Sequence, residues 1–163
     1  MDPALASLLS ARAAAVASRL EASLLAQDAP HYRDAPPEER RGRVERLVAA
    51  FLEAAHAGGP APFVAHVHAI AGERAAEGYD LREIQAALGA LEAQAWPIVV
   101  EAGGATDVVV RRLALVTGIV GRGKDELARA FLDHKDRAEA RAAQLADRLD
   151  KLFKGTDSPP QAQ

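Results

Sequence analysis

The last third of the chain carries an apolar pattern that is too long to fit inside one domain. Between residues 107 and 154 apolar side chains recur at alternating steps near three and four, which is the spacing of an α-helix. An unbroken helix over this range would span roughly 70 Å at 1.5 Å per residue. A single domain of this chain's 163 residues is narrower than that. We therefore predict a long helix whose end projects from the fold.

The two halves of this predicted helix differ in character. The first half is strongly apolar, with its main stripe at Val109, Leu113, Val116, Val120, Leu127 and Phe131. The second half thins to small and aliphatic residues with the repeat of a coiled-coil seam, at Ala138, Ala142, Leu145, Leu149 and Leu152. We expect a domain over residues 1–135, a projecting coiled-coil helix over 136–154 and a disordered tail over 155–163.

The rest of the chain also has helical spacing throughout, and no alternating strand pattern accompanies it. Glycine and proline clusters divide the sequence into about five helices, over residues 2–27, 38–57, 62–77, 81–102 and 107–154. Asp80 followed by Glu83 is the pattern of a capping box at the start of the fourth helix, and Pro97 should kink that helix or loosen its last turns. The predicted fold class is all-α.

Two of these helices carry more apolar surface than one core can cover. The fourth helix has a second apolar stripe, and the last helix is broad in the same way. A helix that is apolar on two sides must be covered on two sides, so we predict a homodimer with Trp96 as the anchor of its interface. The alternative is that the first three helices cover everything. The predicted interface residues are Gly89, Ala93, Trp96, Val100, Leu115 and Ile119.

One glycine-rich segment resembles a phosphate-binding loop. Residues 118–125 match the first seven positions of G-x-x-x-x-G-K-[ST]. The match fails at Asp125, because a carboxylate there would lie beside the phosphates where a hydroxyl should bind magnesium. Gly118 and Gly121 also fit a close approach of helices or a local kink. We therefore keep nucleotide binding only as the least favoured of three functional hypotheses.

A few side chains remain as candidates for binding a ligand. His66 and His68 share a helix but are two residues apart, so they cannot hold one metal ion together, although either could be a proximal haem ligand. A half-buried structural histidine is the commoner case. Tyr79 and Arg74 form a possible ligand pocket. A buried arginine needs an acidic partner, for which Glu77 or Glu83 is suitably placed.

Composition excludes several classes of function. The chain has no cysteine, which rules out a disulfide scaffold, an iron–sulfur cluster and a thiol nucleophile. Its net charge of -3 provides no basic field for nucleic acid. No apolar run approaches the roughly 20 residues of a membrane-spanning helix. We predict a cytoplasmic, non-enzymatic protein with no cofactor, no metal and no membrane insertion.

A spaced set of residues resembles a known family. Arg74, then Gly78-Tyr79-Asp80-Leu81 and Ile84, followed by Leu88, Leu91 and Trp96, is similar to the N-terminal sensor domain of the RsbR-type RsbT co-antagonists of bacterial stress signalling. Val48-x-x-Phe51-Leu52 and Lys124-Asp125-Glu126-Leu127-Ala128 extend the resemblance over most of residues 5–135.

This resemblance implies a globin-like helical fold without haem, dimeric through its last two helices. It also implies that the final helix continues as a linker to an output domain. No such domain follows in this sequence, so we expect a sensor or adaptor whose C-terminal helix docks an unidentified protein partner. A haem- or small-molecule-binding globin-type sensor is the alternative.

Overall fold

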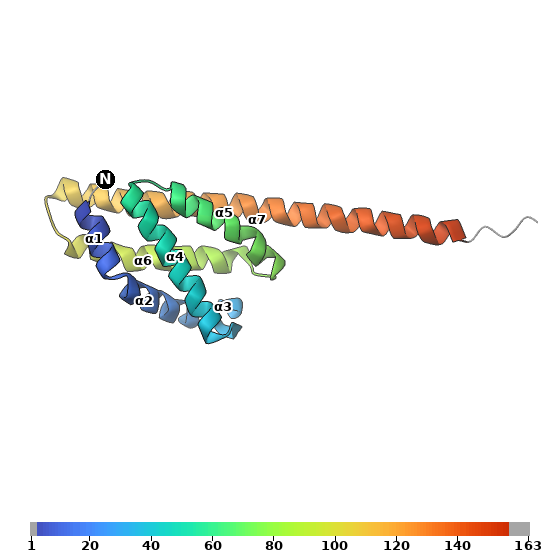
Figure 1. Ribbon diagram of the computed structural model, residues 1–163, viewed down its shortest axis with the longest axis horizontal. Helices are drawn as coiled ribbons and strands as arrows, with labels where there is room; N and C mark the ends of the chain where they lie inside the picture. The colour runs from blue at the N-terminus through green and yellow to red at the C-terminus, as the bar shows by residue number, and fades with distance from the viewer. Residues whose placement is uncertain (1–2, 157–163) are drawn as a thin grey trace, which may run out of the picture.

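The computed structural model describes the backbone of residues 3–156 and the side chains of residues 5–152, and all of its regular elements are helices. They are α1 (Pro3–Ala11), α2 (Ala13–Ala26), α3 (Pro30–Asp34), α4 (Pro37–Ala57), α5 (Ala61–Ala76), α6 (Leu81–Glu101) and α7 (Thr106–Thr156) (Figure 1). The prediction of an all-α fold with a long C-terminal helix is confirmed. Of the expected disordered tail, residues 155 and 156 belong to α7, and the remainder lies outside the described residues.

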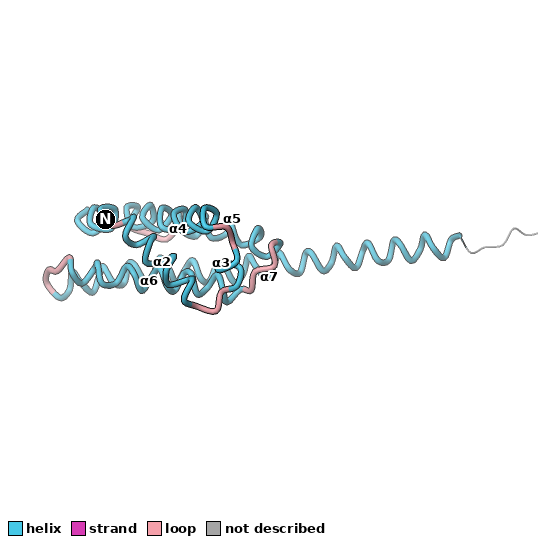
Figure 2. Tube along the Cα trace, turned by 90° about the horizontal axis from the view of Figure 1, so that it is seen from below, coloured by secondary structure: helices cyan, strands magenta, loops and turns pink. Residues whose placement is uncertain are grey.

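The described part of the chain has two helices more than expected. The predicted helix over 2–27 divides at Arg12, where the backbone takes φ -108° and ψ 8° and the guanidinium pairs with Glu101 at the end of α6. The predicted connection over 28–37 contains α3, which begins with Pro30. The break allows both α1 and α2 to pack against α4 and α6. Figure 2 shows these short helices beside the longer ones.

The first part of α7 lies in the core of the bundle. Its side chains Val116, Ile119, Val120 and Leu127 are fully buried, and both α5 and α6 pack along it. Phe51 of α4 and Phe63 of α5 meet edge to face beside it, with ring centroids 6.2 Å apart. The burial of α7 explains the broad apolar surface of its first half.

The contact between α5 and α7 depends on one glycine. A Cβ atom at Gly123 would lie 2.5 Å from Cε1 of Phe63, so only glycine allows the two helices to come this close. The close approach predicted for Gly118 and Gly121 does not occur within this chain, because no atom lies within 4 Å of a Cβ built at either residue. The helix is continuous through all three glycines.

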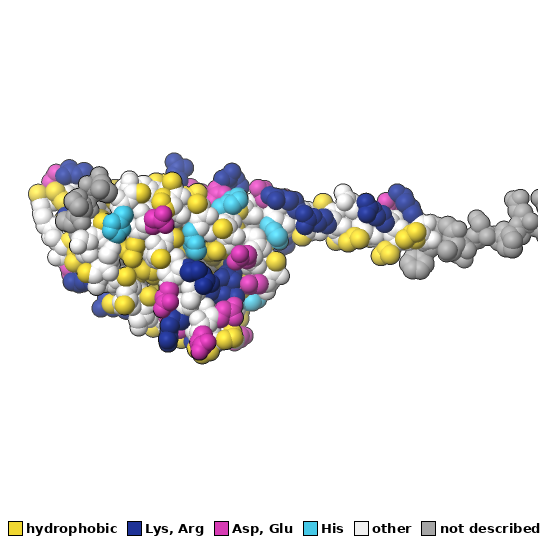
Figure 3. All heavy atoms as spheres, viewed as in Figure 1, with side chains coloured by type: hydrophobic (Ala, Val, Ile, Leu, Met, Phe, Trp, Pro, Cys, Tyr) yellow, Lys and Arg dark blue, Asp and Glu magenta, His cyan; other side chains and the backbone are white. Residues whose placement is uncertain are grey.

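Beyond the core, α7 extends away from the bundle. Residues 135–152 are all exposed, and Leu145, Leu149 and Leu152 are 60%, 53% and 67% exposed. Figure 3 shows hydrophobic side chains along one side of this projecting part, with lysine and arginine side chains along another. The apolar seam predicted for this helix has no cover from the rest of the described chain.

Candidate functional site

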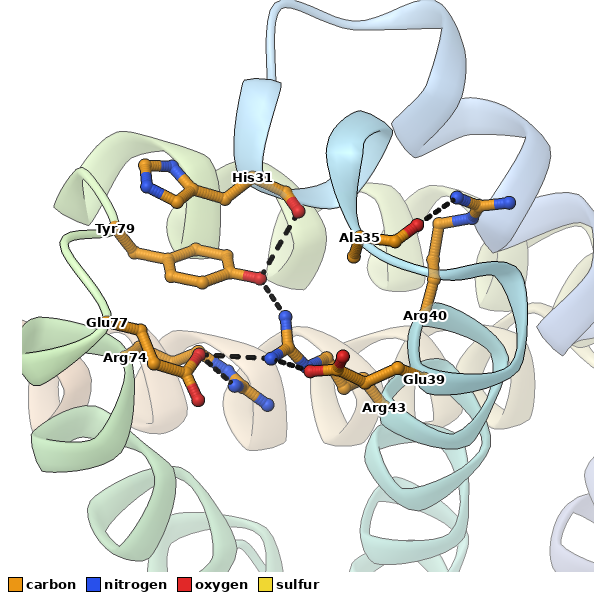
Figure 4. Close-up of polar contacts among 8 residues, drawn as sticks. All are labelled: His31, Ala35, Glu39, Arg40, Arg43, Arg74, Glu77 and Tyr79. Carbon is orange, nitrogen blue, oxygen red and sulfur yellow. Dashed lines mark hydrogen bonds and ion pairs between the residues drawn. The ribbon is translucent and has the colours of Figure 1, made fainter.

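A polar cluster surrounds Tyr79 at the end of the bundle where α3, α4, α5 and α6 meet (Figure 4). Gly78 follows α5 with φ +85°, a conformation that favours glycine, and turns the chain toward α6. Tyr79, which is 5% exposed, comes next. Its ring stacks on the imidazole of His31 at a centroid distance of 4.4 Å and meets Tyr32 edge-on at 5.5 Å. The turn therefore joins α5 and α6 to the short helix α3.

Two nearly buried arginines complete this cluster. The guanidinium carbons of Arg43 and Arg74 lie 5.4 and 5.3 Å from the centre of the Tyr79 ring. Both donate to Oε2 of Glu77, at 3.1 Å from Arg43 and 2.6 Å from Arg74. Arg43 also donates to the Tyr79 hydroxyl and to Glu39. Of the two acidic partners predicted for Arg74, Glu77 is the one that pairs with it, and Glu83 bonds to His31 and Asp80 instead.

Tyr79 and Arg74 border two different pockets. Tyr79 borders an open groove of about 530 Å³, together with Pro30, His31, Asp34, Ala35, Glu39, Arg43 and Glu77. Arg74 instead borders a cavity of about 20 Å³ between α4, α5 and α6. The expected single pocket for these two residues is therefore divided. The groove has three carboxylates and one guanidinium on its wall, so its chemistry suits a small cationic or polar molecule more than an anion.

Glu83 ties α3 to the start of α6 and is 5% exposed. Its Oε1 accepts a hydrogen bond from the Asp80 amide at 3.2 Å, while the Asp80 side chain accepts from Arg82, so the predicted capping box is confirmed. Its Oε2 accepts from the His31 amide at 3.0 Å, and its Oε1 lies 2.7 Å from Nδ1 of His31. The sequence pattern indicates only the local cap, and the link to His31 had no signal in the sequence.

The buried side chain of Tyr32 lies beside this cluster and should make the free energy of unfolding fall at alkaline pH. Burial raises the pKa of Tyr32 to about 12, although the nearby charges of Arg74 and Arg43 act in the opposite direction. An unfolded tyrosine ionises near pH 10. Between pH 10 and 12 the folded state therefore holds more protons, and the free energy of unfolding should fall by about 3 kcal/mol across that window.

We expect urea unfolding at a series of pH values to show constant stability between about pH 8 and pH 10 and a decline above pH 10. Burial also raises the pKa of Tyr79, which adds to the same trend. The control is Tyr32→Phe, which should show a much shallower decline. Equal slopes for the two proteins would contradict the assignment to Tyr32.

The two candidate haem ligands lie in unlike surroundings. His66 is half-buried beside the cavity of about 20 Å³, and its pKa is lowered by burial and by the charges of Arg46 and Arg74. That volume suits a single water molecule and not a porphyrin. His68 points elsewhere, with Nδ1 2.6 Å from Oε1 of Glu126 on α7. The expected divergence of the two histidines is confirmed, and a haem does not fit beside His66 as the side chains are packed.

The segment that resembles a phosphate-binding loop is helical. Residues 118–125 belong to α7 without interruption. Amides inside a helix bond to carbonyls one turn earlier, so they cannot cradle a phosphate. Lys124 donates to Glu92 of α6 at 3.3 Å instead. The interpretation of residues 118–125 as a phosphate-binding loop is therefore wrong, and the nucleotide-binding hypothesis loses the feature that suggested it.

The predicted dimer interface is partly exposed on the single chain. Trp96 is 47% and Val100 is 60% exposed, and Ala93 beside them is exposed as well, so the first helices do not cover this stripe. Gly89 and Leu115 are half-buried. Ile119 is fully buried, because the packing of α5 and α6 turns it into the core, and its assignment to the interface is wrong.

Comparison of the chain with family models, with curated proteins and with solved structures gives no match. Among the described residues, no group of three or more histidine, aspartate or glutamate side chains is arranged to hold a metal ion. Within the same part of the chain, no helix combines the length and the apolar character needed to cross a membrane.

Proposed function

We propose that this chain is a non-enzymatic sensor or adaptor domain of bacterial signalling, which acts as a homodimer and relays a signal or the binding of a partner through α7. The observation that carries the proposal is the continuity of α7. Ile119 and Leu127 are fully buried in the core, while Leu145 and Leu149 are exposed on the same unbroken helix. A shift in core packing would reach the far end of such a rigid element, where an unidentified protein partner would dock.

The homodimer follows from the apolar surface that α6 and α7 leave uncovered. We define the α6/α7 face as Ala93, Trp96, Val100, Val110 and Ala114. Trp96, Val100 and Val110 are 47%, 60% and 57% exposed, and the two helices pack side by side. Exposed apolar surface of this kind marks an interface. A second copy covers it in a symmetric way, because each copy presents the same face to the other.

The family resemblance supports the signalling role. The residues from Arg74 through Tyr79 to Trp96 are those that resemble the RsbR-type sensor domain, for which a globin-like fold without haem is expected. We therefore prefer the sensor or adaptor role to a haem-binding sensor.

Light scattering on the purified chain tests the dimer. We expect a mass of twice the chain mass at micromolar concentration, and Trp96→Asp should weaken association roughly thirtyfold or more, as for a hot spot worth about 2 kcal/mol. Leu25→Asp is the matched control, because Leu25 is 41% exposed and belongs to α2, which contributes no residue to the α6/α7 face. A wild-type mass of one chain up to high concentration would refute the proposal.

A further inference from the structure

We propose that the small cavity between α4, α5 and α6 binds one monovalent anion of the size of a halide, with chloride as the common example. Its volume of about 20 Å³ holds a single particle as large as a water molecule. Three features support an anion there: a buried guanidinium with unused donors, a buried hydroxyl without a partner, and a wall whose charged side chains are basic. The site lies within one chain and is independent of the homodimer proposed above.

Arg74 is almost fully buried but uses few of its donors. Its side chain is 7% exposed. Among the described residues its one hydrogen-bond acceptor is Oε2 of Glu77, and it also lies over the ring of Tyr79. Oε2 of Glu77 accepts from Arg43 as well, so that one carboxylate serves two guanidinium ions (Figure 4). A buried charge with so few partners is costly, and Nε and Nη2 of Arg74 can still donate to an anion.

Tyr32 provides a second unused donor beside the same cavity. Its side chain is 5% exposed and borders the cavity from α3. Its hydroxyl has no hydrogen-bond partner in the described part of the chain, although every side-chain polar atom sealed from solvent there has one. The Tyr32 hydroxyl and the unused nitrogens of Arg74 must therefore touch a space that a solvent-sized particle can enter. Both residues line this cavity.

The wall of the cavity favours a negative charge. Within the described residues no carboxylate lines it, and its basic side chains are Arg43, Arg46, Arg74 and His66. Burial lowers the pKa of His66, and the charges of Arg46 and Arg74 lower it further, whereas Glu73 acts in the opposite direction. The cavity is therefore a place where a positive charge is disfavoured and an anion is stabilised.

The carboxylates nearest to these arginines are directed elsewhere. Glu39 and Glu77 line the open groove beside Tyr79, where their side chains are 47% and 43% exposed. Solvent screens exposed charges of this kind. Glu83 is buried, but it accepts from the His31 and Asp80 amides. The buried guanidinium of Arg74 therefore keeps much of its charge for the cavity.

Size and charge together define the ligand. Sulfate, phosphate and carboxylates contain several heavy atoms and exceed a space that suits one water molecule. A halide ion is close to water in size, and it accepts hydrogen bonds from N–H and O–H donors in any direction. Water also fits, but it leaves the guanidinium charge without a counter-ion. Hydrogen bonds to an ionised partner are the stronger ones, which favours the halide.

A chloride titration at constant ionic strength tests the site, with gluconate as the replacing anion because it is too large for the cavity. The imidazole C–H signals of His66 in the NMR spectrum, assigned with His66→Gln, report binding. We expect a saturable change with chloride and with bromide, and none with gluconate. A bound anion and a protonated His66 attract each other. Chloride should therefore raise the pKa of His66, and it should bind about threefold more tightly, or better, at pH 5.5 than at pH 8.

Two substitutions and one matched control locate the anion. Tyr32→Phe removes the hydroxyl but keeps the ring, and Arg46→Gln removes an exposed charge from the cavity wall. Each should weaken chloride binding by about fivefold or more. Arg41→Gln removes the same charge from α4 at an exposed arginine that does not line the cavity, so it should bind chloride like the wild type. Far-UV circular dichroism checks that each variant is folded.

Three outcomes would overturn the anion site. A change that gluconate produces as well as chloride would reflect screening alone. No change at molar chloride would mean that the cavity holds only water. Equal affinity for chloride in Arg46→Gln and Arg41→Gln, with Tyr32→Phe unchanged as well, would place the anion outside the cavity. None of these results depends on the mass of the assembly, so the proposed homodimer is judged separately by light scattering.

Discussion

Replacing Gly123 with leucine is expected to lower the free energy of unfolding by about 3 kcal/mol, the upper end for overpacking a core. A Cβ atom at this residue would lie 2.5 Å from Cε1 and 2.7 Å from Cδ1 of Phe63. The Phe63 ring is fully buried and packs edge to face on Phe51, so it has no space into which to withdraw. The helices α5 and α7 must therefore separate, although they form the largest helix contact in the bundle. Urea unfolding followed by far-UV circular dichroism measures the change.

The control for this prediction is another glycine of the same helix. Gly118→Ala should raise stability by about 1 kcal/mol, because the new Cβ meets nothing and helix propensity improves. Both proteins are compared in the Trp96→Asp background, so that dimerisation does not contribute. Adding Phe63→Ala to Gly123→Leu should recover part of the loss, which a double-mutant cycle detects as a coupling of about 1 kcal/mol or more. Equal effects at the two glycines, or no coupling with Phe63, would contradict the assigned contact.

The elements that were predictable from sequence are those that local signals specify. Apolar periodicity and glycine or proline boundaries placed α4, α5, α6 and α7 within a few residues, and the Asp80–Glu83 pair identified the cap of α6 correctly. The division at Arg12 was not predictable, because no glycine or proline marks it and its guanidinium pairs with Glu101, far away in the sequence. The short helix α3 was missed because its proline also reads as part of a turn.

The polar cluster shows the same division between local and distant contacts. The pairing of Arg74 with Glu77 joins residues three apart in the sequence and was one of the two pairings predicted. The approach of Arg43 from α4 and of His31 from α3 joins segments that only tertiary packing brings together. The error at Ile119 has a related cause. Periodicity shows that a helix is broadly apolar, but the neighbouring helices decide which flank they cover.

The polar cluster around Tyr79 and the helix α7 are connected through α5 and α6. Arg74 lies at the end of α5, and Tyr79 lies in the turn before α6 begins. These are the two helices that pack along the buried part of α7. A molecule bound in the groove beside Tyr79 would therefore act on both supports of α7 at once. This gives the proposed sensor a route from its surface to its projecting helix.

The bonds of Glu83 to His31 and Asp80 should contribute enough to the free energy of unfolding to be measured directly. Glu83→Ala should lower the free energy of unfolding by about 3 kcal/mol, because it leaves the buried amides of His31 and Asp80 without an acceptor and removes the Glu83 half of the capping box. Glu83→Gln should have about a third of this effect, because glutamine retains a carbonyl oxygen that can accept at the cap. Urea unfolding gives the two free energies.

Amide hydrogen exchange locates the effect of the same substitution. Exchange should accelerate at the amides of His31 and Asp80, which both donate to the Glu83 carboxylate, at 3.0 and 3.2 Å. The Val120 amide in the buried part of α7 is the internal reference. The difference between its free energy of opening and the free energy of global unfolding should be the same in the variant as in the wild type. If Glu83→Ala matched Glu83→Gln in stability, and His31 exchanged at the wild-type rate, the carboxylate would not be what joins α3 to α6.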